Sequence, residues 1–511
     1  MMKMYPAANI DLGDKLPLSS FLFGHRFRTN QTPVEYLIEF LQVMLAQKTN
    51  ISTCDPRNSE GMYFPYISED FDEQISFIPH VGISLKRVIF FNHSKPEGKA
   101  VVDKDAYQDC LKVLQNHIDS DDTQGRRQLI TIIQDLFYGF NATPQNRSWF
   151  DKNMLPICPE VILPEGMGVR TDRNKLKFTD PDDKDKIDSN FAYDKYTYMC
   201  RGGEVYYLHL LNGINQSPES IRESITKHFT KLIEKSFPQF SQLSQFIVKA
   251  WEDHMGTKAR QPEKKLAWIP SGYSCRSKKT AKEISTLLQC DIHPFEKMKV
   301  LSDGIILQLM RAMYEQASNN IDYKCDLWIV DLCKNDPEMR IISSSGFSAN
   351  EDGMHEYIVE GFENIKDKVD IFKPKDTSGK KDISDAAEVS YKLCRKLGKQ
   401  LGFIIPVTGS YMRFTLNERI LKFMVLSLIE PKKKVEFDQF LEMLDTHFGI
   451  VIDRETYCEH VKKCHLPPLA DYSVLDRNKQ AMLVLLKNCG FLRNLSDATS
   501  IVENPFEMEV I

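Results

Sequence analysis

The chain has 511 residues and a formal net charge of −5, from 66 Lys and Arg against 71 Asp and Glu. This length exceeds what one hydrophobic core holds together, so it predicts several domains. The hydrophobic fraction of 42% and the charged fraction of 27% are typical of a globular protein and exclude extensive disorder. The slight negative charge excludes a basic field over the whole chain, so any contact with nucleic acid must be local.

The sequence lacks the usual signals of export, membrane insertion and zinc binding. No run approaches the roughly 18 apolar residues that a membrane span needs. The start lacks the charged and apolar regions of a signal peptide. The twelve cysteines are scattered, and none form C-x-x-C. We therefore expect a cytoplasmic protein with reduced thiols and no contact with a membrane.

The N-terminal region mixes helical and strand patterns. Residues 32–48 have a helical period of apolar side chains, with Thr32 as N-cap and Glu35 completing a capping box. Residues 81–118 predict a strand, a Pro/Gly turn and a helix. A further helix is expected over residues 126–140. These elements predict an N-terminal α+β domain.

Two hairpins are predicted in the middle of the chain. Aromatic and β-branched runs in residues 196–211 flank a Gly-Gly pair, and glycine supplies the positive φ angles of hairpin turns. Residues 325–346 repeat this pattern around Asp336. Helices are expected over residues 217–237 and 296–316. The middle region is therefore expected to be mixed α and β.

The C-terminal region predicts a winged helix-turn-helix domain. A helix capped by Thr415 and Glu418 precedes a short strand at residues 432–437, a helix closed by Gly449 in a C-cap position, further helices and a terminal hairpin. That order is typical of the winged helix, with one extra helix before the hairpin. The expected recognition helix over residues 454–463 carries acidic as well as basic residues. This balance favours a structural or protein-binding role over insertion into a DNA groove.

The predicted architecture is α+β and multidomain, with mixed N-terminal and middle regions and a helical C-terminal domain. Two stretches rich in Pro, Gly and charged residues have the composition of connections. The predicted boundaries are an N-terminal domain at 1–150, a polar connection at 151–190, a middle domain at 191–367, a linker at 368–384 and a C-terminal domain at 385–511.

Two basic clusters stand out against the acidic background. The first, residues 257–282, has eight Lys and Arg against the single acid Glu263, with Trp268 and Tyr273 between them. A cationic loop with aromatic rings is how single-stranded nucleic acid is held, because charge follows phosphates and rings stack on bases. The alternative is an exposed connector whose Trp packs on its own domain. The candidate nucleic-acid-binding residues here are Lys258, Arg260, Lys264, Lys265, Trp268, Tyr273, Arg276, Lys278 and Lys279.

The second cluster, residues 391–434, ends in three consecutive lysines, Lys432, Lys433 and Lys434. Ammonium groups after a helix C-terminus complement the helix dipole, which is a stabilising role without a ligand. Phosphate contact is the other possibility, because each neutralised phosphate releases counterions and adds affinity. Both interpretations stay open at the level of the sequence.

No catalytic motif is present, so we expect no catalytic residue, resident metal or cofactor. The alternative is a divergent metal-dependent nuclease that uses Asp326, Asp331 and Lys334 at the ends of a strand. The same acids are also ordinary strand-end residues. Cys275 lies in a basic segment that would lower its thiol pKa, but it has no histidine partner in the pattern. Two pairs of candidate metal ligands are each too few for a site: Cys290 with His293, and Cys464 with His465.

Parts of the sequence resemble accessory subunits of bacterial antiphage defence clusters. The resemblance lies in "VEFDQFLEMLDTHFGIVID" followed by "GFLRNLSDATSIVENPF", and in "FLFGHRFRTNQTPVEYLIEFLQVML" near the start. Such multi-gene systems are often tied to DNA modification, and their helicase or nuclease subunits perform the chemistry. The resemblance implies a bacterial, non-catalytic subunit that scaffolds these partners and contacts DNA locally. A purely structural protein-interaction subunit is the remaining alternative.

Overall fold

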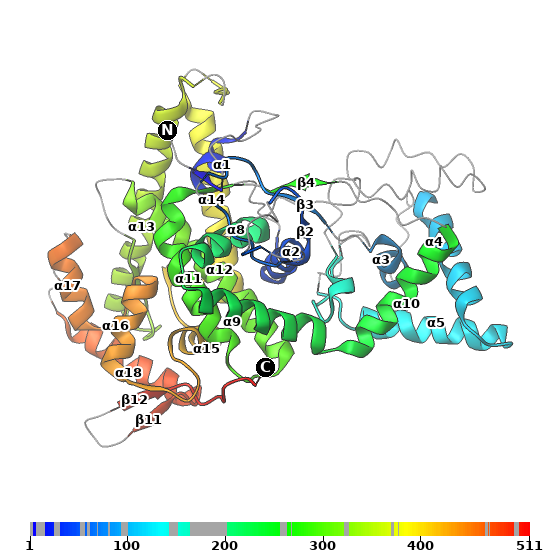
Figure 1. The fold of residues 1–511 in the computed structure, drawn as a ribbon. Helices are drawn as coiled ribbons and strands as arrows, with labels where there is room; N and C mark the ends of the chain where they lie inside the picture. Colours follow the sequence, from blue (N-terminus) through cyan, green and yellow to red (C-terminus); the bar gives the residue numbers. More distant parts are fainter. Residues whose placement is uncertain are drawn as a thin grey trace.

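The structure, a computed structural model, is α+β, with many helices and short strands that pair in small sheets (Figure 1). This confirms the predicted fold class in its coarse form. Within the described part of the chain, no helix combines the length and apolar character needed to cross a bilayer. The structure describes residues 4–6, 16–24, 31–51, 57–58, 62–68, 70–79, 82–92, 101–142, 152–163, 202–255, 263–266, 268–320, 326–368, 372–376, 378–464, 469, 471–494 and 500–510.

The centre of the molecule is built from α2 (Pro33–Leu45), α8 (Gly202–Asn215), α11 (Ser274–Leu288) and α12 (Pro294–Asn319). The α2 helix packs on α8 and α12, and α8 packs on α11. The predicted capping box of α2 is confirmed, because the Thr32 N–H donates to Glu35 Oε2 at 2.6 Å. The predicted helix over 296–316 is also confirmed, as part of α12.

The hairpin predicted at residues 196–211 is wrong from Gly202 onward, where α8 begins. Its glycines serve helix packing instead of a turn. A Cβ on Gly203 would lie 2.5 Å from Tyr36 O, and one on Gly213 would lie 1.9 Å from Ser277 O. Because glycine has no Cβ, α8 can approach the backbones of α2 and α11 this closely.

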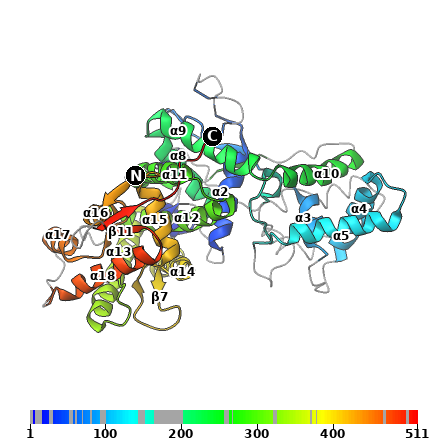
Figure 2. The same cartoon turned by 90° about the horizontal axis from the view of Figure 1, so that it is seen from below.

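A helical arm extends from this centre, with a hydrophobic core of its own (Figures 1 and 2). The strand predicted after residue 81 is wrong, because this segment forms a helix, α3 (Ile83–Phe90). The helix predicted over 126–140 is confirmed as part of α5 (Thr123–Tyr138). Residues 152–163, placed in the predicted polar connection, bury Ile157 and Val161 in the arm core. The arm consists of α3 (Ile83–Phe90), α4 (Val101–His117), α5 (Thr123–Tyr138), a 3₁₀ turn (Pro159–Val161) and α10 (Pro238–Met255).

The hairpin predicted at residues 325–346 is also wrong. Asp336 is the N-cap of the long helix α13 (Pro337–Ile365), and its Oδ1 accepts from the Glu338 N–H at 3.0 Å. The preceding strand β6 (Trp328–Ile329) pairs in parallel with β10 (Ile450–Val451), far along the chain. Strand propensity was present at β6, but its partner is distant in sequence.

The next segments connect α13 to the C-terminal region. The α14 helix (Lys380–Leu401) begins inside the predicted linker, after a buried Phe372. The strands β7 (Ile404–Ile405) and β8 (Arg413–Phe414) form an antiparallel pair. Val330, directly after β6, forms a parallel bridge with Phe414 of β8. These pairings join the middle of the chain to its C-terminal region.

The C-terminal region contains a three-stranded antiparallel sheet in the order β11-β12-β9. The predicted cap by Thr415 and Glu418 is wrong, because Asn417 is the N-cap of the first helix and its Oδ1 accepts from the Ile420 N–H. The predicted C-cap at Gly449 is confirmed, with φ of +63°. In chain order the elements are α15 (Glu418–Leu428), β9 (Lys434–Glu436), α16 (Phe437–Phe448), β10, α17 (Arg454–Cys464), α18 (Ser473–Asn488), β11 (Leu492–Asn494) and β12 (Ser500–Glu503).

One large hydrophobic core joins distant parts of the chain. It contains Phe40, Trp328, Leu421 and Val502, so the segments 1–150, 191–367 and 385–511 all contribute to it.

The predicted helix over 217–237 is formed by α9 and a π-helical turn, and it starts at Glu219. The remaining elements are β1 (Met4–Tyr5), α1 (Leu18–Phe23), β2 (Gln47–Lys48), β3 (Ser76–Ile78), α9 (Glu219–Thr230), the π-helical turn (Lys231–Lys235), β4 (Lys264–Lys265), β5 (Ile269–Pro270) and a 3₁₀ turn (Ser271–Tyr273).

Candidate functional site

The first basic cluster is not the exposed loop that the sequence predicts. Its second half forms the N-terminal part of α11, and Lys264 and Lys265 form β4, which pairs with β3. Lys258 and Arg260 lie outside the described residues. The cluster is therefore divided between a strand and a helix, and only part of it faces solvent.

Both aromatic residues of this cluster are core residues. Trp268 is 2% exposed and Tyr273 is 1% exposed. The Tyr273 hydroxyl donates to Phe23 O at 2.8 Å, and burial raises the pKa of this phenol well above its ordinary value. Neither ring is available to stack on a base, so the expectation of an exposed aromatic platform here is wrong.

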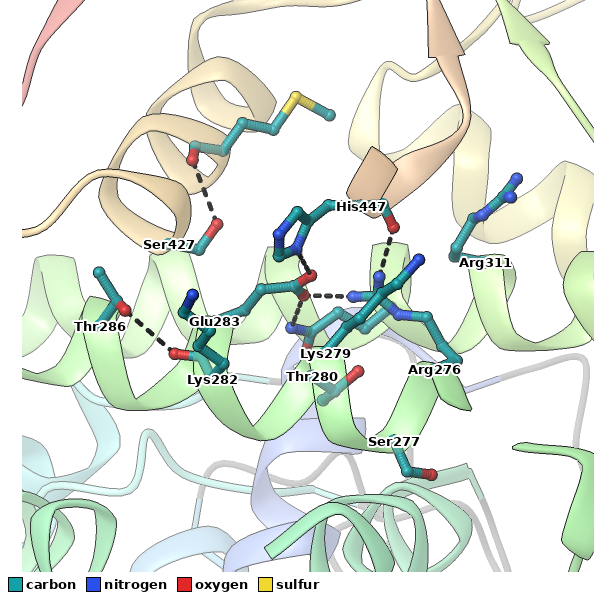
Figure 3. Close-up of polar contacts among 12 residues, drawn as sticks. Arg276, Ser277, Lys279, Thr280, Lys282, Glu283, Thr286, Arg311, Ser427 and His447 are labelled. Carbon is teal, nitrogen blue, oxygen red and sulfur yellow. Dashed lines mark hydrogen bonds and ion pairs between the residues drawn. The ribbon is translucent and has the colours of Figure 1, made fainter. Parts of the chain in front are cut away.

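Arg276 belongs to a buried polar network that joins α11 to the end of α16 (Figure 3). Its guanidinium forms an ion pair with Glu283 and donates to His447 O. His447 Nδ1 lies 2.7 Å from Glu283 Oε1, and Gln308 Nε2 donates to Glu283 Oε2 at 2.7 Å. Burial opposes ionisation of Glu283, but Arg276 and His447 hold the pKa of this carboxyl below its ordinary value.

Lys279 extends the same connection at the surface. Its Nζ donates to Thr446 O at 2.6 Å, in the last turn of α16. Cations near a helix C-terminus are stabilising because carbonyl oxygens there have no partner within the helix. Arg276 and Lys279 thus connect α11 to α16. This contact explains the two basic residues at these positions without a bound ligand.

The three consecutive lysines lie beside carboxylates of the C-terminal segment. Lys432 Nζ is 2.6 Å from Glu507 Oε1, and Lys434 Nζ is 3.6 Å from Glu503 Oε2. Glu503 also pairs with Arg493. These ion pairs reduce the local positive charge. Besides Lys432 and Lys434, the exposed lysines in the described part of these segments include Lys265, Lys278, Lys282 and Lys433, and Lys264 is half-buried.

The acids of the nuclease alternative each have an arginine partner. Asp326 Oδ2 lies 2.8 Å from Arg311 Nη2, and the fully buried Asp331 Oδ2 lies 2.7 Å from Arg413 Nε. Lys334 directs its backbone N–H, not its ammonium group, to Asp331 Oδ1 at 2.8 Å. Metal binding by these carboxylates would have to displace buried cations, which is costly.

The other candidate ligands and nucleophiles do not assemble either. In the described part of the chain, no three His, Cys, Asp or Glu side chains are grouped as metal ligands. The buried Cys290 Sγ accepts from Asn504 Nδ2, whereas His293 accepts from the Phe295 N–H as the N-cap of α12. Cys275 is exposed on α11. The side chains of Cys464 and His465 lie outside the described residues.

The last helix before the terminal hairpin, α18, is fixed to the body of the molecule. Asn478 is fully buried; its Oδ1 accepts from the Leu332 N–H at 2.8 Å, and its Nδ2 donates to Val330 O and Ile452 O at 2.9 Å each. The exposed Arg477 pairs with Asp336 across this contact. One side of the N-terminal half of α18 is therefore fixed to the body, whereas Asp476, Arg477 and Gln480 are exposed.

The sequence interpretation missed an exposed apolar stripe on α5. Leu129, Ile132 and Leu136 are 43%, 62% and 46% exposed, while Ile133 and Phe137 on the adjacent side are buried in the arm core. Their spacing of i, i+3 and i+7 places them along one face. The sequence carries a signal for this stripe, because its apolar residues cover a wider arc of α5 than the contact with the arm core requires.

Comparison of the chain with protein-family models, with curated proteins and with solved structures finds no match.

Proposed function

We propose that this chain is a non-catalytic subunit of a bacterial antiphage defence complex, which holds partner proteins together and makes local contacts with nucleic acid. The observation that carries the proposal is the exposed stripe of α5. The arm that bears α5 lies at the opposite end of the molecule from α17 and α18 (Figure 2). A projecting arm with an apolar outer face is suited to holding a partner.

The occupant of the stripe is proposed to be an amphipathic helix of a partner subunit. Apolar residues at i, i+3 and i+7 are the anchors that helix-to-helix recognition uses. Full burial of one aliphatic side chain of this size contributes about 1.5–3 kcal/mol. Leu129, Ile132 and Leu136 are 43–62% exposed, so each would contribute a part of this amount on binding.

A winged helix-turn-helix architecture at the C-terminus is part of the proposal. It is supported by the order of α15, β9, α16, α18, β11 and β12, and by the sheet order β11-β12-β9. The extra element is then α17, which the sequence suggested as the recognition helix, because α18 is the helix that directly precedes the hairpin. Because Asn478 attaches α18 to the body, we assign this region to protein organisation rather than to reading a DNA groove.

The nucleic-acid contact is proposed to be electrostatic and sequence-tolerant. It would use the exposed Lys265, Lys278 and Lys433, together with Lys264, which precedes Lys265 in β4. Each phosphate neutralised releases counterions, so binding should weaken steeply with salt. Binding of labelled DNA at two salt concentrations tests this part, with Lys264, Lys265 and Lys278 replaced by Glu. Affinity that is unchanged in this variant would remove these lysines from the proposal.

Partner binding is tested with the proteins encoded by the genes that neighbour the gene of this chain. The full-length chain carrying Ile132→Glu should lose about tenfold or more in affinity for the partner that docks on α5, because it buries a charge in an apolar contact. Thr131→Glu is the matched control, since it adds the same charge on the polar side of α5. Equal binding by wild type and both variants, or no binding of any neighbouring product, would contradict the proposal.

A further inference from the structure

The loop between β7 and β8 presents an aromatic ring to solvent. All residues from 407 to 411 are exposed, and Tyr411 is 75% exposed. Tyr411 has φ of +60°, in the left-handed region that side chains other than glycine rarely adopt. A non-glycine residue in this region is strained, so the loop holds Tyr411 in an unfavourable backbone conformation.

The loop lies against the first turns of α13. Ser344 Oγ donates to the backbone oxygen of Tyr411 at 3.4 Å, which places the backbone of Tyr411 beside this helix. Ile341 and Arg340 precede Ser344 by about one turn; Ile341 is 67% exposed and Arg340 is also exposed. Arg340 Nη2 donates to Lys334 O at 3.3 Å, so Lys334 belongs to the same surface.

This surface has cations and hydroxyls but few available carboxylates. Neither residues 339–350 nor residues 404–417 contain Asp or Glu. Of the acids before these segments, Asp331 pairs with Arg413, and Asp336 and Glu338 pair with Arg477. Asp352 and Glu418, which follow the segments, are exposed. The exposed Ser345 and Ser348 add hydroxyl donors on α13. The positive charges of Arg340 and Lys334 are therefore not offset by acids within the surface segments.

We propose that Tyr411, with Arg340 and Lys334, is a stacking site for a base of single-stranded nucleic acid. An exposed ring beside cations is the arrangement that holds unpaired bases, because stacking accepts any base and the cations follow the phosphates. A duplex keeps its bases within the helical stack, so it offers far fewer free base faces for stacking on Tyr411. The inference rests on the nucleic-acid part of the proposed function and moves the aromatic contact from the buried Trp268 and Tyr273 to Tyr411.

The test is anisotropy of a labelled oligothymidylate of about 15 nucleotides, a length that covers one typical single-strand site. The full-length Tyr411→Ala variant should bind it about five- to 100-fold more weakly than wild type, the range for loss of one stacked base. Tyr411→Phe, which keeps the ring, should stay within about twofold of wild type. Arg340→Gln should lower the salt slope by about one phosphate contact.

Controls separate this site from the function on which it rests. Val484→Ala removes an exposed apolar side chain on α18 and should leave affinity unchanged. If wild type does not bind the oligonucleotide, the nucleic-acid part of the proposed function fails, and this site fails with it. If wild type binds and Tyr411→Ala binds equally well, the stacking site is overturned while the proposed function stands. Loss of a protein partner alone in Tyr411→Ala would make this surface a protein-docking site and would also overturn the inference.

Discussion

Arg276 and Glu283 form an ion pair within α11 whose side chains are 1% and 0% exposed. Three further polar contacts of these two groups, to the backbone and side chain of His447 and to Gln308, extend the network, and Arg276 Nε alone of the guanidinium nitrogens is buried without a hydrogen-bond partner (Figure 3). A buried ion pair is stable only when such hydrogen bonds satisfy its remaining atoms. The network thus fixes the end of α16 on the central helices.

Removal of the cation alone should be strongly destabilising. Arg276→Met leaves Glu283 as a buried, uncompensated carboxylate, so we expect it to lower the free energy of unfolding by about 3–5 kcal/mol. Replacing both partners, in Arg276→Met with Glu283→Met, should cost less than the single change because no buried charge remains. Urea unfolding measures both variants. A double variant that is less stable than Arg276→Met would contradict this account.

A second prediction concerns His209 on α8, which is fully buried. Its Nδ1 lies 2.8 Å from Ser277 Oγ and its Nε2 lies 3.0 Å from Thr280 Oγ1. Burial, followed by the charge of Arg276, lowers the pKa of His209 to about 3. Since the ordinary value is 6.5, the unfolded chain binds a proton between these pH values that the folded chain does not bind. Folding stability should therefore fall as the pH decreases below about 6.5.

The size of this effect can be isolated by substitution. One proton of difference changes stability by about 1.4 kcal/mol per pH unit over this range. His209→Gln should remove that component of the slope between about pH 6.5 and 5, even though the variant is less stable overall. His355→Gln, at an exposed position of α13, should leave the slope as in wild type. An unchanged slope in His209→Gln would show that His209 is not the group responsible.

Local signals in the sequence were read more reliably than distant contacts, although the cap predicted at Thr415 and Glu418 is wrong. The capping box of Thr32 and Glu35 and the glycine C-cap at Gly449 depend on a few neighbouring residues, and both are present. Gly203 was assigned to a turn because glycine permits positive φ, but here it permits contact with α2, more than 160 positions away along the chain. Such a role is visible only once the two helices are paired in space.

For the candidate site, too, the sequence alone does not show which residues meet in space. The sequence places Trp268 and Tyr273 among lysines, and this pattern alone does not distinguish a ring on the surface from one in a core. The exposed Tyr411 stands in a stretch with one nearby arginine, Arg413, which is itself buried with Asp331. The cations beside Tyr411 come from α13, so only the fold brings them together.

The last prediction concerns the attachment of α18. Asn478→Ala removes one side chain that serves three backbone groups, those of Leu332, Val330 and Ile452. Buried backbone groups without partners cost about 1–3 kcal/mol each, so the loss should be at least about 2 kcal/mol in urea unfolding and should make α18 more sensitive to limited proteolysis. Gln480→Ala, at an exposed position of the same helix, should have little effect. If the two variants are cut and unfold alike, Asn478 is not what holds α18 to the body, and an open DNA-reading face for this helix becomes the better account.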